Sequence, residues 1–148
     1  MTGAHRETSG HRETRGHRGR REAYQYAVLR AVPRIDRGEF VNVGVILYCQ
    51  AMDFLRAGVA VDDVRLRALA ADVDTDGVRL AAEAVARACH EPVATARENT
   101  GLATRFGMLT APRSSVVQPS PVHAGVTHNP ERTLVDLMSR LVGPPRPA

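Results

Sequence analysis

The chain has 148 residues, of which 43% are hydrophobic and 24% are charged, a composition that fits one globular domain and excludes two full-sized ones. Its formal charge at pH 7 is +4. Residues 1–22 hold six arginines and three glutamates, which gives +3, whereas residues 23–148 hold fourteen arginines and thirteen acidic residues, which gives +1. With three Phe, three Tyr and no Trp, the nearly neutral remainder offers few stacking platforms for bases. We therefore expect no nucleic-acid binding by the domain and only weak attraction of phosphates by residues 1–22.

The N-terminal segment is a six-residue repeat, in which HRETSG begins at His5, HRETRG at His11 and HRGRRE at His17. These polar residues cannot build an apolar face, so residues 1–22 are predicted to form a disordered tail. Two interpretations stay open: an arm that attracts phosphate, or an expanded DNA repeat or misassigned start codon upstream of the true domain. We expect a single domain at residues 23–143, followed by a proline-rich end at residues 144–148.

The sequence shows no pattern typical of a membrane-spanning helix or of a signal peptide. No apolar run approaches the roughly 18 residues that a membrane-spanning helix needs, and the N-terminus lacks the apolar core of a signal peptide. These features predict a cytoplasmic protein that does not enter the membrane. Cys49 and Cys89 lie 40 residues apart in unrelated elements, which favours two buried free thiols over a disulfide framework.

Three strands are predicted first, at residues 24–32, 40–49 and 53–61, as an antiparallel meander. In the second strand a period of two puts one set of side chains on a core face: Val41, Val43, Val45, Leu47 and Cys49. The opposite face is mixed: Phe40, Asn42, Gly44, Ile46 and Tyr48. A glycine in mid-strand indicates that another backbone or a ligand approaches closely, or that Gly44 marks a bulge or lies under a helix.

Helices dominate the second half. Asp62 and Asp63 begin a short helix, and a longer helix is predicted at residues 77–90. Residues 93–110 are predicted to be a loop with a short helical turn at 105–109, and residues 114–118 a fourth strand cut by two prolines. The last helix runs from the N-cap Asn129 to Gly143, with a buried stripe and an exposed ion pair: Leu134, Leu137, Met138, Leu141 and Val142 in the stripe, Asp136 and Arg140 in the pair.

Together these elements predict an α+β fold, with an antiparallel sheet of about four strands (a meander plus a late strand) packed against about three helices.

One motif matches a metal site. Asp72, Asp74, Asp76, Gly77 and Glu83 fit the spacing D-x-D-x-D-G-x5-E of a calcium-binding EF-hand loop. The same aspartates are good turn and N-cap residues before a helix, and the chain offers no second loop to pair with. We favour the capping interpretation and predict no metal and no cofactor, while calcium remains an alternative for the four carboxylates.

Polar residues near the C-terminus form a second constellation. Arginine beside hydroxyl groups can hold an anion, and a histidine can move a proton near neutral pH. The candidates for contact with an anion or a partner include six residues of this region: Arg113, Ser114, Ser115, Gln118, Ser120 and His123. Three more come from the first hairpin, which also carries Arg30 and Arg34: Arg37, Glu39 and Asn42. No catalytic residue is assigned, because no nucleophile elbow, phosphate loop or paired-carboxylate motif accompanies them.

Two stretches carry a resemblance: YQYAVLRAVPRIDRGEFVNVGVILYC at residues 24–49 and RFGMLTAPRSSVVQPSPVHAGV at residues 105–126. Together they resemble the family called domain of unknown function 3037, small bacterial proteins, over nearly all of residues 24–142. The family has no established activity, so no residue role is carried over. The resemblance implies a context, because such proteins are often encoded beside HipA-type serine/threonine kinase homologues.

We therefore expect a cytoplasmic accessory protein that binds a protein partner, with the HipA-type kinase homologue as the candidate partner, rather than an enzyme. The contact surface would combine a hairpin block (residues 37–44) and a proline block (residues 113–123). The alternative is a small enzyme or anion receptor for a ligand that carries phosphate or carboxylate, which requires Arg113, His123 and Glu39 to converge on one concave surface.

Overall fold

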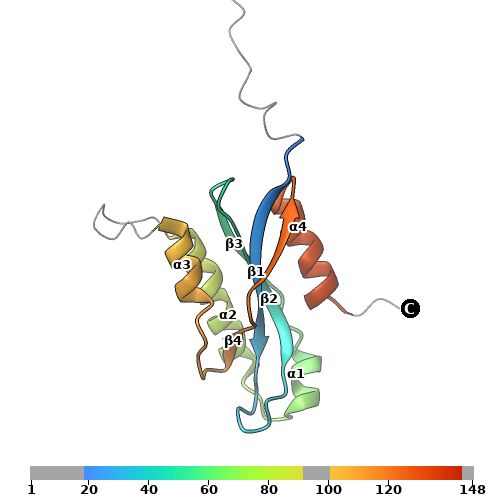
Figure 1. Cartoon of the computed structure of the whole chain (residues 1–148). Helices are drawn as coiled ribbons and strands as arrows, with labels where there is room; N and C mark the ends of the chain where they lie inside the picture. Colours follow the sequence, from blue (N-terminus) through green and yellow to red (C-terminus); the bar gives the residue numbers. More distant parts are fainter. Residues whose placement is uncertain (1–18, 92–100, 145–148) are drawn as a thin grey trace, which may run out of the picture.

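A five-stranded antiparallel sheet forms the centre of the molecule (Figure 1). The computed structural model describes residues 19–91 and 101–144. The predicted meander is confirmed by β1 (Glu22–Ala31), β2 (Val41–Cys49) and β3 (Phe54–Val59), each antiparallel to the next. β1 begins at Glu22, the last residue assigned to the tail from composition.

The other side of β1 pairs with two short strands, β4 (Val117–Pro119) and β5 (His123–Thr127). The predicted late strand is therefore confirmed by β4, but its end was placed too early and the further strand β5 was missed. Pro119 belongs to β4 and lies opposite Leu29, and β5 follows two residues after the second proline. A proline is tolerated here because β4 is an edge strand. The N–H group that proline lacks would face outward, where no strand is present to accept its hydrogen bond.

Three helices cover one face of the sheet: α1 (Asp63–Leu69), α2 (Thr75–His90) and α3 (Gly101–Leu109). The first two confirm the predicted helices, and their N-caps are Asp62 and Asp74. α3 is longer than the predicted turn. Its Phe106 is buried and stacks on Tyr48 of β2 with ring centroids 5.4 Å apart, so tertiary packing explains a helix that local propensity alone does not show.

The opposite face carries α4 (Pro130–Leu137), which continues into a π-helical turn, η1 (Met138–Val142). Figure 1 shows α4 on one side of the sheet and α2 and α3 on the other. The Asn129 side chain accepts a hydrogen bond from the Arg132 N–H (3.2 Å), and Arg140 pairs with Asp136 at 3.2 Å, as predicted. The predicted apolar stripe of this helix packs on β2.

β2 contains a bulge at Val43. Leu29 lies opposite Gly44 and Arg30 lies opposite Asn42, so Val43 has no partner on β1. The extra residue inverts the alternation: Val43 packs with Ile46 under α2 and α3, whereas Val45 packs under α4. The prediction of one core face and one mixed face was therefore wrong, because both faces are buried between helical layers.

Gly44 lies where a second backbone approaches, one of the explanations left open from sequence. A Cβ atom at this position would lie 2.6 Å from the carbonyl oxygen of Gly58 and 3.0 Å from Cδ1 of Leu29. Neither the β3 backbone nor the buried leucine can move away easily. The glycine thus permits β3 to pair closely beside the bulge.

In the described ranges, residues 19–91 and 101–144, no helix has the length and apolar character needed to cross a membrane.

Gly44→Ala is expected to lower the free energy of unfolding by about 1–3 kcal/mol, because the added methyl overpacks the β2–β3 contact. Gly107→Ala is the matched control, since a Cβ atom at this helical position meets no atom within 4 Å. It should leave stability unchanged or raise it by about 1 kcal/mol. Urea unfolding of both variants measures the difference, and equal effects would contradict the proposed clash.

Candidate functional site

The hairpin block and the proline block meet through β1. The Val32 N–H donates a hydrogen bond to the Val116 carbonyl (2.7 Å), and β4 pairs directly with the end of β1. The loop between β1 and β2 and the loop that leads into β4 therefore lie at the same end of the sheet, the lower end in Figure 1. Two stretches that are about 75 residues apart in sequence form one surface there.

At this end, three polar side chains form a row across three strands. Arg30 in β1 lies opposite Asn42 in β2 and opposite Gln118 in β4. Residues directly opposite in an antiparallel sheet project from the same face. Arg30 follows Tyr24, Tyr26 and Val28 at a spacing of two, and the two tyrosines pack toward α4, so the row lies on the α4 side of the sheet. We call Asn42, Arg30 and Gln118 the polar row.

In the polar row, Asn42 is hydrogen-bonded to η1, whereas the central Arg30 lacks a hydrogen-bond acceptor for its Nε–H. Nδ2 of Asn42 donates to the Leu141 carbonyl at 2.9 Å, while Oδ1 of Asn42 is buried without a hydrogen-bond partner. Nε of Arg30 is also buried without one. The guanidinium carbon of Arg30 lies 4.2 Å from the centre of the Phe40 ring. The ring lies against the guanidinium and attracts its positive charge but supplies no hydrogen-bond acceptor.

Arg30 differs from the other half-buried arginines of the described residues. Arg79 pairs with Asp63 at 2.8 Å, Arg65 donates to the Val142 carbonyl at 3.2 Å, and Arg105 donates to the Cys89 carbonyl at 3.4 Å. Arg30 has no acidic partner and no carbonyl acceptor among residues 19–91 and 101–144. Its positive charge is therefore not neutralised within the part of the chain that the structure describes.

Sequence reasoning named Arg30 only as a neighbour of the hairpin and did not include it among the candidates. The available signal was its position in β1, where an arginine follows Tyr24, Tyr26 and Val28 on one face of the strand. Asn42 and Gln118 were candidates, and Arg30 lies between them and supplies the charged group of the row.

The other candidates are held in separate places. Arg37 forms an ion pair with Glu39 in the exposed β1–β2 loop, and the hydrogen bond to Glu39 raises the pKa of Arg37. Arg113 donates to the Met108 carbonyl of α3 at 2.8 Å. His123 lies opposite Tyr26 on the α4 side, with ring centroids 5.2 Å apart.

Arg113, His123 and Glu39 therefore do not converge, and that prediction was wrong. The physical reason is the sheet itself: α3 binds Arg113 on one side of it, whereas His123 lies on the other. Ser114 is exposed, and Ser115 donates to the Val117 carbonyl at 2.6 Å, a local bond between the loop and the start of β4.

Ser120 has a structural task. Its Oγ accepts a hydrogen bond from the Val28 N–H (2.8 Å) and donates one to the Pro121 carbonyl (2.9 Å), and the side chain is buried. The Ser120 N–H in turn donates to the Val28 carbonyl at 2.8 Å. The hydroxyl thus fastens the bend between β4 and β5 onto β1.

The aspartates of the calcium-like motif have different partners. Asp74 accepts a hydrogen bond from the Gly77 N–H (3.0 Å) as the N-cap of α2, Asp72 pairs with Arg34 at 3.5 Å and Asp76 pairs with Arg79 at 3.3 Å. Within residues 19–91 and 101–144, no three His, Cys, Asp or Glu side chains gather as metal ligands would. The contacts support the capping interpretation.

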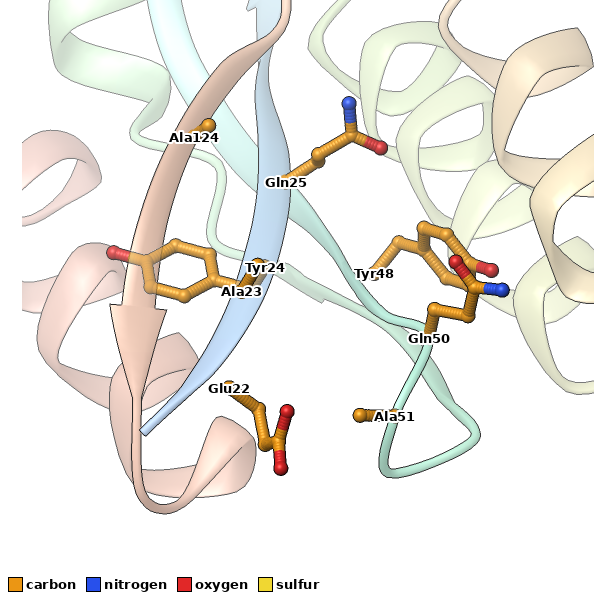
Figure 2. Close-up of a pocket in the computed structure, with 8 residues that line it drawn as sticks. All are labelled: Glu22, Ala23, Tyr24, Gln25, Tyr48, Gln50, Ala51 and Ala124. Atoms are coloured by element: carbon orange, nitrogen blue, oxygen red, sulfur yellow. The ribbon is translucent and has the colours of Figure 1, made fainter. Parts of the chain in front are cut away.

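A pocket of about 720 Å³ lies at the opposite end of the sheet (Figure 2). The side chains that Figure 2 places around it come from β1, the end of β2, the turn that follows β2, and β5: Glu22, Ala23, Tyr24, Gln25, Tyr48, Gln50, Ala51 and Ala124. The Tyr24 ring points away from Gln25 and Tyr48 and lies against Gly125, where a Cβ atom would be 2.6 Å from the phenol oxygen. Glu22 is the only carboxylate in this lining, so the pocket offers no pair of carboxylates.

Both cysteines are free and buried, as predicted. Burial raises the pKa of the Cys89 thiol to about 11, and the nearby Arg105 only partly opposes this effect. Burial, followed by the neighbouring Tyr26, raises the pKa of Tyr24. A protonated, buried thiol is a poor nucleophile, so Cys89 has the properties of a core residue.

Comparisons with known proteins add one match. Residues 26–142 match the family model described as Protein of unknown function (DUF3037), so the matched range includes the whole polar row and leaves out residues 1–25. No curated protein and no solved structure matches the chain.

Ser120→Ala is expected to lower the free energy of unfolding by about 1–3 kcal/mol, because the buried Val28 N–H loses its acceptor. Ser114→Ala removes an exposed hydroxyl from the same block and should leave stability within about 0.5 kcal/mol. Chemical denaturation measures both. A neutral Ser120→Ala variant would show that the hydroxyl does not fasten the bend.

The Cys89 thiol predicts a pH dependence of stability. Its pKa is raised in the folded chain, so its contribution is complete below pH 9, the unfolded value, and is lost as the pH rises toward 11. The free energy of unfolding should therefore fall more steeply over this range in the wild type than in Cys89→Ala. Denaturant titrations across the range measure the two slopes, and parallel slopes would contradict the prediction.

Proposed function

This chain belongs to the family of proteins of unknown function DUF3037, and we propose that it is a cytoplasmic accessory protein that acts by binding another protein. The candidate partner is a HipA-type serine/threonine kinase homologue, which the genetic context of similar proteins suggests. The binding surface is the hairpin end of the sheet, defined as residues 33–40 together with residues 113–116.

One observation carries this proposal: the hairpin block and the proline block share one exposed end of the sheet, while their ionisable groups do not share a reaction centre. Apolar side chains are exposed at this end, where Ile35 is 56% exposed, Phe40 44% and Val116 38%. Arg37 and Glu39 pair beside them. Apolar residues surrounded by paired charges are typical of the centre and rim of a protein–protein contact.

The alternative function is a small enzyme or an anion receptor for a phosphate- or carboxylate-bearing ligand. The scattered positions of Arg113, His123 and Glu39 give the enzyme no support. The receptor is favoured by a different observation, the unneutralised guanidinium of Arg30 in the polar row.

The docking proposal is tested by co-purification of the full chain with a HipA-type kinase homologue at physiological salt. The double substitution Ile35→Asp and Val116→Asp should weaken binding about tenfold or more, because it places two charges in an apolar contact. Phe40 stays unchanged, since its ring also lies against Arg30.

Val135→Asp is the matched control, because Val135 is 69% exposed on α4, away from the hairpin end. It should bind like the wild type. Failure of the wild type to retain the kinase homologue would refute this choice of partner, and equal weakening by Val135→Asp would refute the choice of surface.

A further inference from the structure

We propose that the polar row is a binding site for an oxyanion, a phosphate or carboxylate group held by the guanidinium of Arg30 and the side-chain amide of Gln118. The inference deepens the alternative function above and does not depend on the docking proposal.

The first argument is charge. A half-buried guanidinium has given up part of its hydration, and it regains that loss only through hydrogen-bond acceptors or an opposite charge. Arg79, Arg65 and Arg105 obtain acceptors from the described residues. Arg30 obtains only the face of the Phe40 ring, and its buried Nε–H has no acceptor in residues 19–91 and 101–144.

Three nearby acceptors are already engaged, and the free Oδ1 of Asn42 makes no hydrogen bond with Arg30. The carbonyls at the end of η1 accept hydrogen bonds from Asn42 (Leu141 carbonyl, 2.9 Å) and from Arg65 (Val142 carbonyl, 3.2 Å). Glu39, the residue before Phe40, pairs with Arg37 in the exposed loop. The acceptor that Arg30 lacks is therefore one that a ligand can supply.

The second argument is geometry. Arg30 lies directly between Asn42 and Gln118 across the three strands, and its guanidinium carbon lies over the Phe40 ring. A planar, preoriented guanidinium presents a fork of N–H donors that matches two oxygens of a carboxylate or phosphate. The half-buried amide of Gln118 adds donors on the β4 side.

Asn42 has a positioning role in this site. Its Nδ2 is tied to η1, so its orientation is fixed, and its unsatisfied Oδ1 is an acceptor beside the fork. An acceptor there suits a protonated oxygen, such as the hydroxyl of a phosphate monoanion or a bound water. Nε of Arg30 and Oδ1 of Asn42, the buried side-chain atoms without partners in the described residues, thus lie on residues that face each other across two strands.

The test is a titration of the ¹⁵N-labelled full chain with inorganic phosphate and, separately, with acetate, followed through the Arg30 Nε–H and Gln118 side-chain amide signals. Saturable shifts of both signals are expected with at least one of the two anions. Saturation by phosphate alone identifies a phosphorylated ligand, and saturation by acetate identifies a carboxylate; either result supports the site. Linear, unsaturated shifts with both anions would overturn it.

Variants separate this site from general attraction by arginine. Arg30→Gln should weaken anion binding about tenfold or more, whereas Arg132→Gln, which removes an exposed arginine from α4, should not change it. Arg30→Lys keeps the charge and the fold but loses the fork, and weaker binding is expected.

Thermal unfolding of each variant shows whether it is folded. If Arg30→Gln does not fold, the result with Arg30→Lys decides the test. Unchanged affinity in the folded Arg30 variant would overturn the proposal. Because no partner protein is present in these titrations, failure of the docking proposal leaves their outcome unaffected.

Discussion

β1 hydrogen-bonds along one side with β2 and along the other with β4 and β5, so three other segments of the chain depend on one central strand. Its inner residues Ala27 and Leu29 are fully or almost fully buried, because helices pack on both faces of the sheet. Ser120 completes this arrangement by accepting the Val28 N–H where the edge bends between β4 and β5. Every proposed feature at the hairpin end requires β1 to hold the two distant blocks in register.

Local chemistry explains why much of the fold could be predicted. Asp62, Asp74 and Asn129 each carry the short polar side chain that satisfies free N–H groups at a helix start, and each is an N-cap in the structure. Gly143 ends the last helical turn, as expected. Caps and hydrophobic periodicity are properties of neighbouring residues, so they can be seen in one sequence without knowledge of the fold.

Features that depend on distant contacts were missed. The stretch VNVGVILYC reads as alternation with one buried face, yet its nearly continuous apolar character also fits a strand buried on both faces. The bulge at Val43 decides which residues face which helices, and Gly58 and Leu29 approach Gly44 closely beside it. α3 likewise depends on Phe106 reaching Tyr48, 58 residues earlier in the chain.

The candidate site shows the same limit. Asn42 and Gln118 were singled out for their chemistry, but the bulge places Asn42, and not Val43, opposite Arg30. One residue of slip on either strand would send these side chains to the other face of the sheet. The polar row is therefore a product of strand register, which a sequence without its pairing partners does not reveal.

Phe40 takes part in both functional proposals. Its ring is 44% exposed at the hairpin end, where it belongs to the apolar docking surface, and it also lies against the guanidinium of Arg30. Ile35 and Val116 are exposed at the same end and have no part in the polar row, whereas Gln118 contributes to the row through β4. An oxyanion on Arg30 would bring negative charge to the border of an apolar contact, where its interactions are screened less than in open water. The same strand register that joins the two blocks thus places a charge-binding group at the edge of a protein-binding surface.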